Sequence, residues 1–311
     1  MPAIITHHLF GEDASQLLPN DLVSDQEDLL AFLLGNQGSD PFWSRVCPNV
    51  NTMVSCHRLA TTMHATKVVD AFMSLRQAVL HLPKDDMSVG RAFVLGILAH
   101  YLLDRITHPL VYALQEDIIN ADPTLEDARG DIHAIIESDI DTWILWQMRQ
   151  QTILANPASI SLMSTKRIDR VAGALFSYMA QEVYDIEIGP AEFGHALENY
   201  RFVYRVIDPP SNRLAKVVWA TERFARPYSR LQAMAHRVTI NDECPSANLD
   251  HRPWRNLSTG ELSRASFADL FHEALTAWPV FSQHFIEGDR ERLSNMVDGV
   301  NYDGWPDDPT A

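Results

Sequence analysis

The pattern of apolar and polar positions predicts helices along almost the whole chain. Apolar residues recur at helical spacing, and the two-residue alternation typical of strands is rare. The clearest amphipathic stripe lies near the chain's end, where one helical face carries Phe267, Leu270, Phe271, Ala274, Leu275, Trp278 and Phe281. The predicted helices span residues 25–34, 52–82, 88–107, 125–153, 164–184, 190–206, 212–238 and 266–287.

Glycine and proline mark the expected helix ends. Gly35 ends the first predicted helix and Pro83 the second, while Pro109 limits the third and Pro123 precedes the fourth. We therefore expect an all-α, multi-helix fold. The connecting segments are a Gly-, Asn- and Ser-rich loop over 35–43, a polar loop over 241–261 and a tail, 301–311, that we expect to be frayed.

The sharpest chemical signal is the segment AHYLLDRITHP. It places His100, Asp104 and His108 four residues apart, so that all three share one face of a helix. Two imidazoles and a carboxylate that converge in this way are a good ligand set for a divalent metal. The surrounding run is so apolar that Asp104 needs a partner there, and a salt bridge with Arg91 or Arg105 is the alternative to a metal.

A second segment, HAIIESDID, repeats this spacing. His133, Glu137 and Asp141 again lie one helical turn apart, and a histidine and a carboxylate at this distance can bind one ion. The same stretch also reads as a solvated charged face. Asp141 either orients a neighbouring histidine, His133 or His108, or is an exposed helix residue.

Composition and charge narrow the possible partners. The net charge is −16, from 41 acidic and 25 basic residues, without a Lys/Arg-rich run. Binding to duplex nucleic acid or to an anionic membrane surface is therefore disfavoured. Cys47, Cys56 and Cys244 form no paired framework, the N-terminus lacks the pattern of a secretory signal, and no uninterrupted apolar stretch has the length of a membrane span. We expect a cytoplasmic protein without an integral membrane segment, whose oligomeric state stays open.

Read in order, five segments resemble the bacterial zinc-dependent phospholipase C family: THHLFG, GNQGSDPFW, MHATKVVDAF, AHYLLDRITHPLVY and HAIIESDID. More distantly, the chain is similar to secreted phospholipases C, clostridial alpha-toxin and the fungal trinuclear-zinc nucleases. The resemblance covers about residues 1–145. Its HYxxDxxxHP core is specific, and the other segments support it mainly by their order.

The resemblance implies two to three Zn²⁺ ions. The helical pattern predicts one helical domain over residues 1–311, with a metal-site half over about 1–156 and a second helical half over about 157–311. The resemblance also implies a bridging role for Asp104, and Asp40 is the candidate general base. His57 is the competitor of His64, and His8 that of His7. The three implied ligand sets are Asp40, His64, His100 and Asp104; His108, His133 and Glu137; and His7, Asp104 and the chain's own N-terminus.

The chain departs from the secreted enzymes at two points. Those enzymes have two more residues between the aspartate and the following HP histidine, so the position of His108 in the second ligand set is open. They also bind the third zinc through an N-terminal Trp, whereas this chain begins Met1-Pro2. We hypothesise that Met1 is removed and that Pro2 offers the free amine, which an intact-mass measurement on native protein decides.

We therefore expect a zinc-dependent hydrolase that cleaves phosphate esters, as a phospholipase C-like phosphodiesterase, with a metal-activated water. Its substrate would be a small phosphate ester or a phospholipid head group. Phe42, Trp43 and Tyr101 line the substrate cleft or pack in the core. A non-catalytic zinc-binding scaffold or interaction protein is the main alternative.

Two other helical metalloprotein classes fit the sequence less well. The His-Asp dipeptide of HD-type phosphohydrolases is absent from the chain. A ferritin-like di-iron bundle needs two Glu-x-x-His motifs on separate helices, and Glu192–His195 supplies one.

Overall fold

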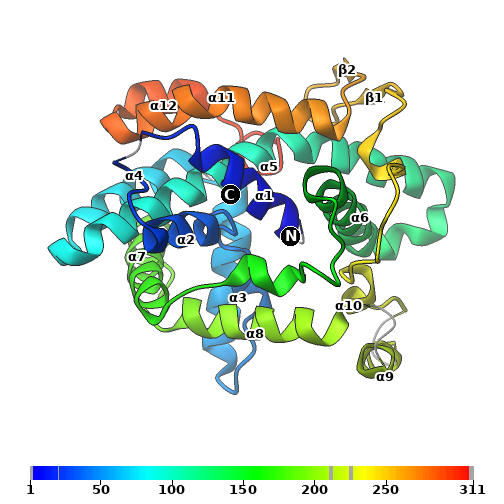
Figure 1. The fold of residues 1–311 in the computed structure, drawn as a ribbon, viewed down its shortest axis with the longest axis horizontal. Helices are drawn as coiled ribbons and strands as arrows, with labels where there is room; N and C mark the ends of the chain where they lie inside the picture. Colours follow the sequence, from blue (N-terminus) through cyan, green and yellow to red (C-terminus); the bar gives the residue numbers. More distant parts are fainter. Residues whose placement is uncertain (1–2, 20, 210–212, 224–226, 308–311) are drawn as a thin grey trace. The chain divides into compact units, whose positions relative to one another are not determined.

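The protein is helical in nearly all of its regular structure (Figure 1). The computed structural model describes residues 3–19, 21–209, 213–223 and 227–307. Within these ranges it has one two-stranded antiparallel sheet, β1 (Trp254–Arg255) with β2 (Leu262–Ser263), so the all-α prediction is confirmed. The α-helices of these ranges are α1 (Ile4–Ser15), α2 (Gln26–Gly35), α3 (Val50–Ala65), α4 (Val68–Leu80), α5 (Met87–Ala121), α6 (Arg129–Arg149), α7 (Lys166–Tyr184), α8 (Glu192–Ile207), α9 (Arg213–Glu222), α10 (Arg230–Ala233), α11 (Phe267–Glu287) and α12 (Arg290–Val297). The 3₁₀-helices are η1 (Asp40–Ser44), η2 (Lys84–Asp86), η3 (Pro123–Ala128), η4 (Ala158–Leu162) and η5 (Pro245–Ala247).

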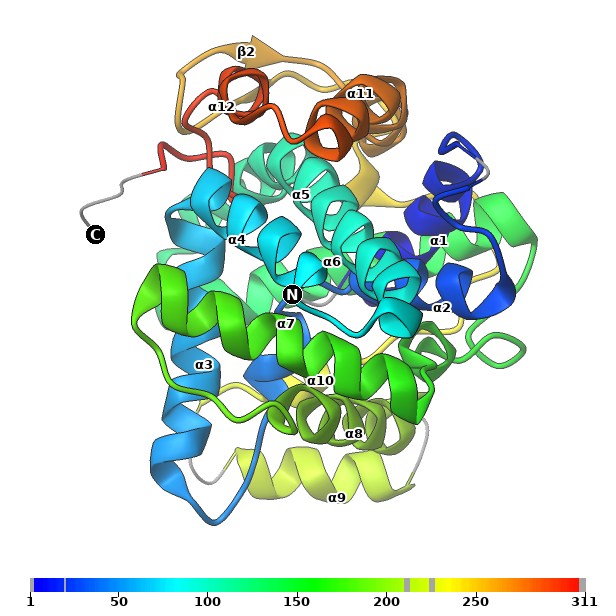
Figure 2. The same ribbon diagram turned by 90° about the vertical axis from the view of Figure 1, so that its left-hand side faces the viewer.

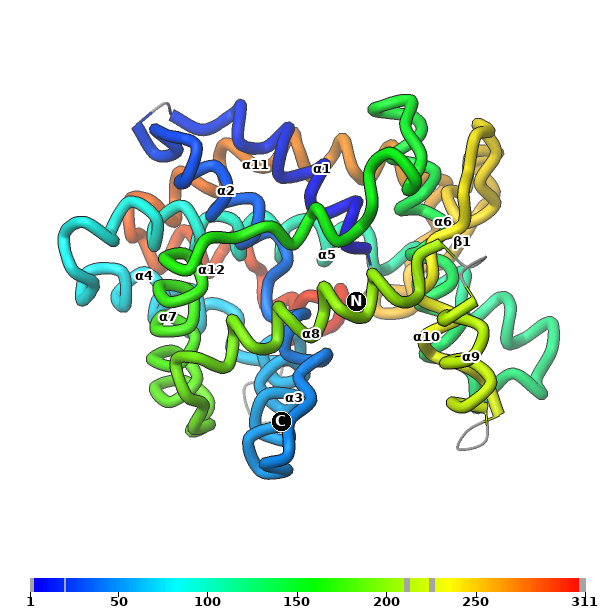
Figure 3. Tube along the Cα trace, turned by 60° about the horizontal axis from the view of Figure 1, so that its bottom comes forward, coloured from blue at the N-terminus to red at the C-terminus, as the bar shows by residue number. Residues whose placement is uncertain are grey.

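The chain divides into two compact units. The first unit comprises Met1–Leu9, Thr107–Ser161 and Arg201–His272, and the second comprises Phe10–Ile106, Leu162–Tyr200 and Glu273–Ala311. Each unit combines segments from both predicted halves of the chain, and the single domain over residues 1–311 stays a prediction. In the second unit α4 packs along α7 (Figure 2), and in the first unit α10 packs against α6 and α9 (Figure 3).

Two glycines bring the backbones of α2 and α5 into direct contact. A Cβ atom at Gly35 would lie 2.1 Å from the carbonyl oxygen of Phe93, and one at Gly96 would lie 2.1 Å from that of Phe32. Both distances are far inside van der Waals contact, so any side chain here would force the helices apart. This close crossing sets the loop after α2 against the middle of α5, where His100 lies.

The predicted helix over 52–82 is wrong as one element, because it is two helices, α3 and α4. Lys67 adopts a left-handed backbone conformation with φ +58°, which ends the helical path between them. The carboxylate of Asp307 then accepts hydrogen bonds from the backbone N–H groups of Lys67 and Val68, at 2.6 and 3.0 Å. A residue near the chain's end thus caps α4, which local spacing could not predict.

Pro109 does not limit the predicted helix over 88–107, because α5 continues through it to Ala121. A proline inside a helix removes one backbone donor and costs about 3 kcal/mol. Buried apolar residues on both sides, among them Leu103, Leu110 and Val111, outweigh that cost.

The predicted helix over 125–153 is too long, since residues 123–128 form η3 and α6 ends at Arg149.

The predicted helix over 212–238 is also wrong beyond α9. Residue 212 and residues 224–226 lie outside the described residues, while 227–229 are not helical and α10 is short. Pro227 disfavours a continuous helix there. The carboxylate of Glu222 accepts hydrogen bonds from the backbone N–H groups of Arg230 and Leu231, at 3.0 and 3.2 Å, and so starts α10 separately.

The expectation of a frayed tail is wrong for residues 301–307. The side chain of Asn301 donates a hydrogen bond to the carbonyl of Ala65 at 3.1 Å, and the backbone N–H of Tyr302 donates to that of His64 at 3.2 Å. Tyr302 is only 1% exposed. Burial of the ring and these hydrogen bonds together offset the entropy lost on ordering the segment. Residues 308–311 lie outside the described residues.

One helix among the described residues, Lys84–Ala121, is long and apolar enough to cross a membrane by length and composition alone. The protein buries 83% of its most apolar window. The core helix of a globular protein passes the same test, and this helix carries three of the predicted ligands.

Candidate metal centre

The second unit brings together Asp40, His64, His100 and Asp104, which we call the first cluster. Asp40 begins η1, His64 lies in the last turn of α3, and His100 and Asp104 are one turn apart on α5. All four side chains are buried. His64 Nε2 lies 3.2 Å from Asp40 Oδ1, His100 Nε2 lies 3.2 Å from Asp104 Oδ2, and the two Nε2 atoms are 3.5 Å apart.

These separations fit the donor set of a zinc ion. Nitrogen and oxygen donors bind tetrahedral zinc at about 2.0–2.1 Å, which puts neighbouring donors roughly 3.3 Å apart. His64 Nε2 lies 3.9 Å from Asp104 Oδ2, and His100 Nε2 lies 3.9 Å from Asp40 Oδ1. Asp40, His64 and His100 offer donor atoms that all lie within 4.8 Å of one another, and Asp104 lies beside both histidines. Imidazoles and carboxylates are donors that zinc accepts.

Backbone carbonyl groups fix both imidazole rings of the first cluster. His100 Nδ1 donates to the carbonyl of Asn36 at 3.0 Å, and His64 Nδ1 donates to that of Ala60 at 2.8 Å. A carbonyl oxygen can only accept, so each neutral ring keeps its proton on Nδ1. Both Nε2 lone pairs therefore face the cluster, which is the arrangement in which histidine binds a metal.

Gly38 makes room for the His100 ring. A Cβ atom at this position would lie 2.5 Å from His100 Cδ2 and 2.7 Å from Nε2, and Gly38 has φ +53°. Both the space and the backbone conformation therefore require glycine. Residues 36–40 thus supply the tight turn at Gly38, the carbonyl that holds the His100 ring and the Asp40 carboxylate.

Two aromatic rings cover the first cluster. The ring centroid of Trp43 lies 4.7 Å from that of His64, and the centroid of Tyr302 lies 4.7 Å from His64 and 5.7 Å from His100. Trp43 is partly exposed, as a residue at a cleft would be, whereas the other two aromatic candidates, Phe42 and Tyr101, are buried in the core. Sequence reasoning missed Tyr302, because nothing in the local sequence connects the tail to the ligands.

The first unit contains a second cluster, formed by His108, His133 and Glu137. His108 Nε2 and His133 Nε2 lie 3.4 and 3.2 Å from the same carboxylate atom, Glu137 Oε1. His133 Nδ1 donates to the side-chain oxygen of Gln115 at 3.2 Å, which turns Nε2 toward the cluster. In spite of the shortened spacing before it, His108 therefore lies with its predicted companions. Sequence reasoning did not single out Gln115.

The electrostatics of both clusters favour ionised carboxylates. The pKa of Asp40 lies below its usual value: burial raises it, and the hydrogen bond with His64 and the nearby imidazoles are among the interactions that lower it. The pKa of His64 is raised in turn, against the effect of its own burial, mainly by Asp40. Burial likewise opposes ionisation of Glu137, and the two adjacent histidines hold its pKa well below normal.

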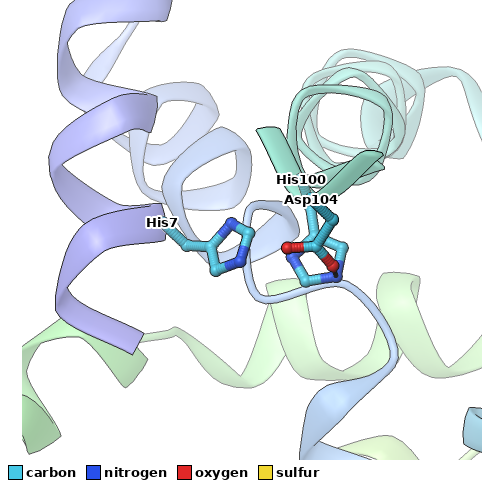
Figure 4. Close-up of side chains that lie close together, drawn as sticks. All are labelled: His7, His100 and Asp104. Carbon is cyan, nitrogen blue, oxygen red and sulfur yellow. Dashed lines mark ion pairs between the residues drawn. The ribbon is translucent and has the colours of Figure 1, made fainter. Parts of the chain in front are cut away.

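The remaining predicted ligands divide between the two units. Figure 4 shows His100 and Asp104 on α5 and His7 on α1. His7 belongs to the first unit and Asp104 to the second, so the third ligand set stays a prediction. Met1 and Pro2, on which that set also depends, lie outside the described residues.

The alternative histidines have other environments. The ring of His57 donates through Nε2 to the carbonyl of Arg45 at 2.9 Å, away from the first cluster that contains His64. His8 is partly buried, next to the fully buried His7 on α1. His195 of the ferritin-like motif is exposed and lies 3.9 Å from Glu192, which pairs with Arg45 instead.

Both predictions for Asp141 are wrong. The residue is fully buried, and its hydrogen bonds go neither to His133 nor to His108. They join the first turn of α1 and the ring of His236 instead. The i, i+4 spacing suggested the nearer histidines, whereas a residue far along the chain is the actual partner.

The helical fold, with two buried histidine–carboxylate clusters, defines a class of metal-binding proteins whose donors suit zinc. The model of one family, described as zinc dependent phospholipase C, matches residues 6–185. The chain belongs to this family, which confirms the resemblance. No curated protein and no solved structure matches the chain.

Proposed function

We propose that this protein is a zinc-dependent hydrolase that cleaves phosphate esters, in the manner of a phospholipase C-like phosphodiesterase. The observation that carries the proposal is the first cluster, in which the Nε2 atoms of His64 and His100 lie 3.5 Å apart and each lies 3.2 Å from a carboxylate oxygen. Asp40, His64, His100 and Asp104 would hold one zinc, and His108, His133 and Glu137 a second. His7 is the proposed ligand of a third.

Bound zinc supplies Lewis acidity and lowers the pKa of its water to about 7, so that no serine or cysteine nucleophile is needed. The protein's own contribution is orientation and proton handling. Asp40 is the proposed general base, because its carboxylate is ionised and lies at the first cluster. Trp43, partly exposed beside His64, is placed to contact a substrate.

The two clusters differ in how many protein donors they offer. Structural zinc sites are closed by four protein ligands, whereas catalytic sites keep one position open. The second cluster has three donors and so leaves a position for water or substrate. In the first cluster Asp40, His64 and His100 lie within 4.8 Å of one another, and Asp104 as a fourth ligand of the same ion would close the site, which suits a non-catalytic zinc-binding scaffold. That reading is the second candidate function.

The proposed substrate is a small phosphate ester or a phospholipid head group. An excess of acidic residues and the absence of a basic run argue against duplex nucleic acid. Cys47, Cys56 and Cys244 are free thiols, which suits our proposal of a cytoplasmic location.

The first test is the zinc content of untagged native protein, measured by elemental mass spectrometry. We expect two to three zinc ions per chain, and loss of zinc in His100→Ala and Asp104→Ala. His64→Gln and His57→Gln form a matched pair on α3, and only the first should lower the zinc content. A wild-type protein that binds no zinc after reconstitution would overturn the proposal.

The second test separates catalysis from a structural role. We expect the zinc-loaded protein to hydrolyse bis(p-nitrophenyl) phosphate or p-nitrophenyl phosphate, and the preferred probe indicates a diester or a monoester substrate. Asp40→Asn keeps an oxygen that can ligate zinc but cannot accept a proton, so kcat should fall strongly while the zinc content is retained. If Asp40→Asn also loses one zinc, Asp40 acts through metal binding and not as the base, and full zinc without any turnover in the wild type would favour the scaffold.

A further inference from the structure

We propose that Asp208, His236 and Asp141 form a positioning network that fixes the first turn of α1, and with it the backbone that carries His7. All of these residues belong to the first unit. Asp208 follows α8, His236 follows α10, and Asp141 lies on α6. His236 and Asp141 are both 0% exposed, so no substrate reaches them.

Asp141 binds the start of α1 through both carboxylate oxygens. Oδ1 accepts hydrogen bonds from the backbone N–H and the hydroxyl of Thr6, at 2.7 and 2.6 Å, and Oδ2 accepts from the backbone N–H of Ile5 at 3.0 Å. The first N–H groups of a helix have no partner within it, and a negative charge at that end is favourable. Asp141 thus caps α1 from another helix.

His236 completes the network between the two aspartates. Its Nε2 donates to Asp141 Oδ2 at 3.0 Å, and its Nδ1 and backbone N–H donate to the two oxygens of Asp208 at 2.8 and 2.9 Å. Ionised carboxylates only accept, so both ring nitrogens carry protons and the ring is an imidazolium. Its charge lies beside the buried carboxyl group of Asp141 and offsets the cost of burying that group. The ring of Tyr204 stacks on the imidazole, with centroids 5.3 Å apart.

The network reaches beyond the part of the chain that matches the family model. That match ends at residue 185, whereas Asp208 and His236 come later in the sequence. The later segment therefore supports a helix that carries a proposed ligand near the chain's start. The consequence for metal binding rests on the proposed function, whereas the consequence for the helix does not.

Two independent readouts test the network on the full-length, zinc-loaded protein. The first is hydrogen–deuterium exchange of the peptide that contains Ile5 and Thr6. We expect at least about tenfold faster exchange in His236→Gln and in Asp208→Asn, because the capping carboxylate loses its fixed position. The second is a chelator titration, in which one zinc should bind about 10- to 100-fold more weakly while the others are unchanged. A merely structural role would weaken all zinc ions or none.

Thr239→Val is the matched control. The hydroxyl of Thr239 donates to that of Thr142 at 3.1 Å, so this variant cuts a hydrogen bond to α6 without touching Asp141. We expect neither readout to change in it. If His236→Gln does not fold, Thr6→Val removes only one hydrogen bond to Asp141 and should still accelerate exchange.

Unchanged exchange of this peptide in folded His236→Gln and Asp208→Asn would overturn the network. Faster exchange without a change in any zinc affinity would overturn its link to His7. A wild-type protein that binds no zinc would contradict the proposed function, while the exchange result would still decide the network.

Discussion

The two clusters use similar donors but are assembled in different ways. The second cluster comes from two helices, with His133 and Glu137 one turn apart on α6 and His108 on α5. The first cluster needs η1, α3 and α5, a glycine turn and a tyrosine from the end of the chain. Helical spacing in the sequence therefore predicts most of the second cluster, whereas the first cluster depends on how distant segments pack.

The largest expected effect comes from removing one histidine from each cluster. His100→Ala should remove zinc from the first cluster and His133→Ala from the second. Loss of a residue that only supports a metal ligand lowers affinity or activity by up to about 100-fold, so loss of a ligand should lower hydrolysis by more than that. Zinc counts per chain and kcat/KM measure both effects. His251→Ala, at an exposed position, is the control. A variant that loses all its zinc would show that the clusters are not independent.

The network of His236 differs from both clusters because a protonated imidazole, and not a metal, offsets the charge of its carboxylates. Burial opposes the charge on this imidazole, but Asp208 and Asp141 raise its pKa to about 10. A folded-state pKa above the unfolded value stabilises the protein fully below about pH 6.5, and the contribution is lost as pH rises through 10. A shift of this size corresponds to about 5 kcal/mol.

Urea unfolding of the zinc-free protein measures this contribution. The stability difference between wild type and His236→Gln should be largest near pH 6 and shrink toward pH 10. The other charged groups near the ring, Asp139 and Arg237, are present in both proteins and largely cancel in the difference. A difference that grows with pH would contradict a protonated His236.

Gly38→Ala tests whether the His100 ring of the first cluster needs the space that Gly38 leaves beside it. The added Cβ meets the His100 ring at 2.5 Å, so we expect a loss of about 2 kcal/mol in the free energy of unfolding and weaker zinc binding at the first cluster. Gly260→Ala is the matched control, because Gly260 also has a positive φ, of +76°, but no atom within 4 Å of the added Cβ. Equal effects of the two variants on zinc binding would refute this role of Gly38.

Gln115→Leu has the smallest expected effect and is specific to the second cluster. It removes the acceptor of His133 Nδ1, so zinc affinity there should fall about tenfold, through loss of ring orientation. The first cluster should be unaffected, because its imidazoles are held by backbone carbonyls. Competition with a zinc chelator measures both sites. A drop at the first cluster instead would contradict this assignment.

The sequence alone determined the helical class, several helices and most of the residues that the clusters contain. The predicted helices over 25–34, 164–184, 190–206 and 266–287 correspond to α2, α7, α8 and α11. Helical spacing also placed His100 beside Asp104 and His133 beside Glu137, because residues four apart share a face. These features depend on neighbours along the chain, and so a single sequence carries them.

Tertiary structure decided what depends on distant residues. In the folded protein His64, and not His57, lies in the first cluster. Asp307 caps α4 where α3 has ended, and Tyr302 is buried beside the imidazoles. The tertiary structure also gave Asp141 a different partner from the one its spacing suggested. Such contacts join segments up to 240 residues apart. The free energy of these hydrogen bonds and buried rings offsets the entropy lost on ordering the chain only when the whole unit packs. No local sequence pattern therefore predicts them.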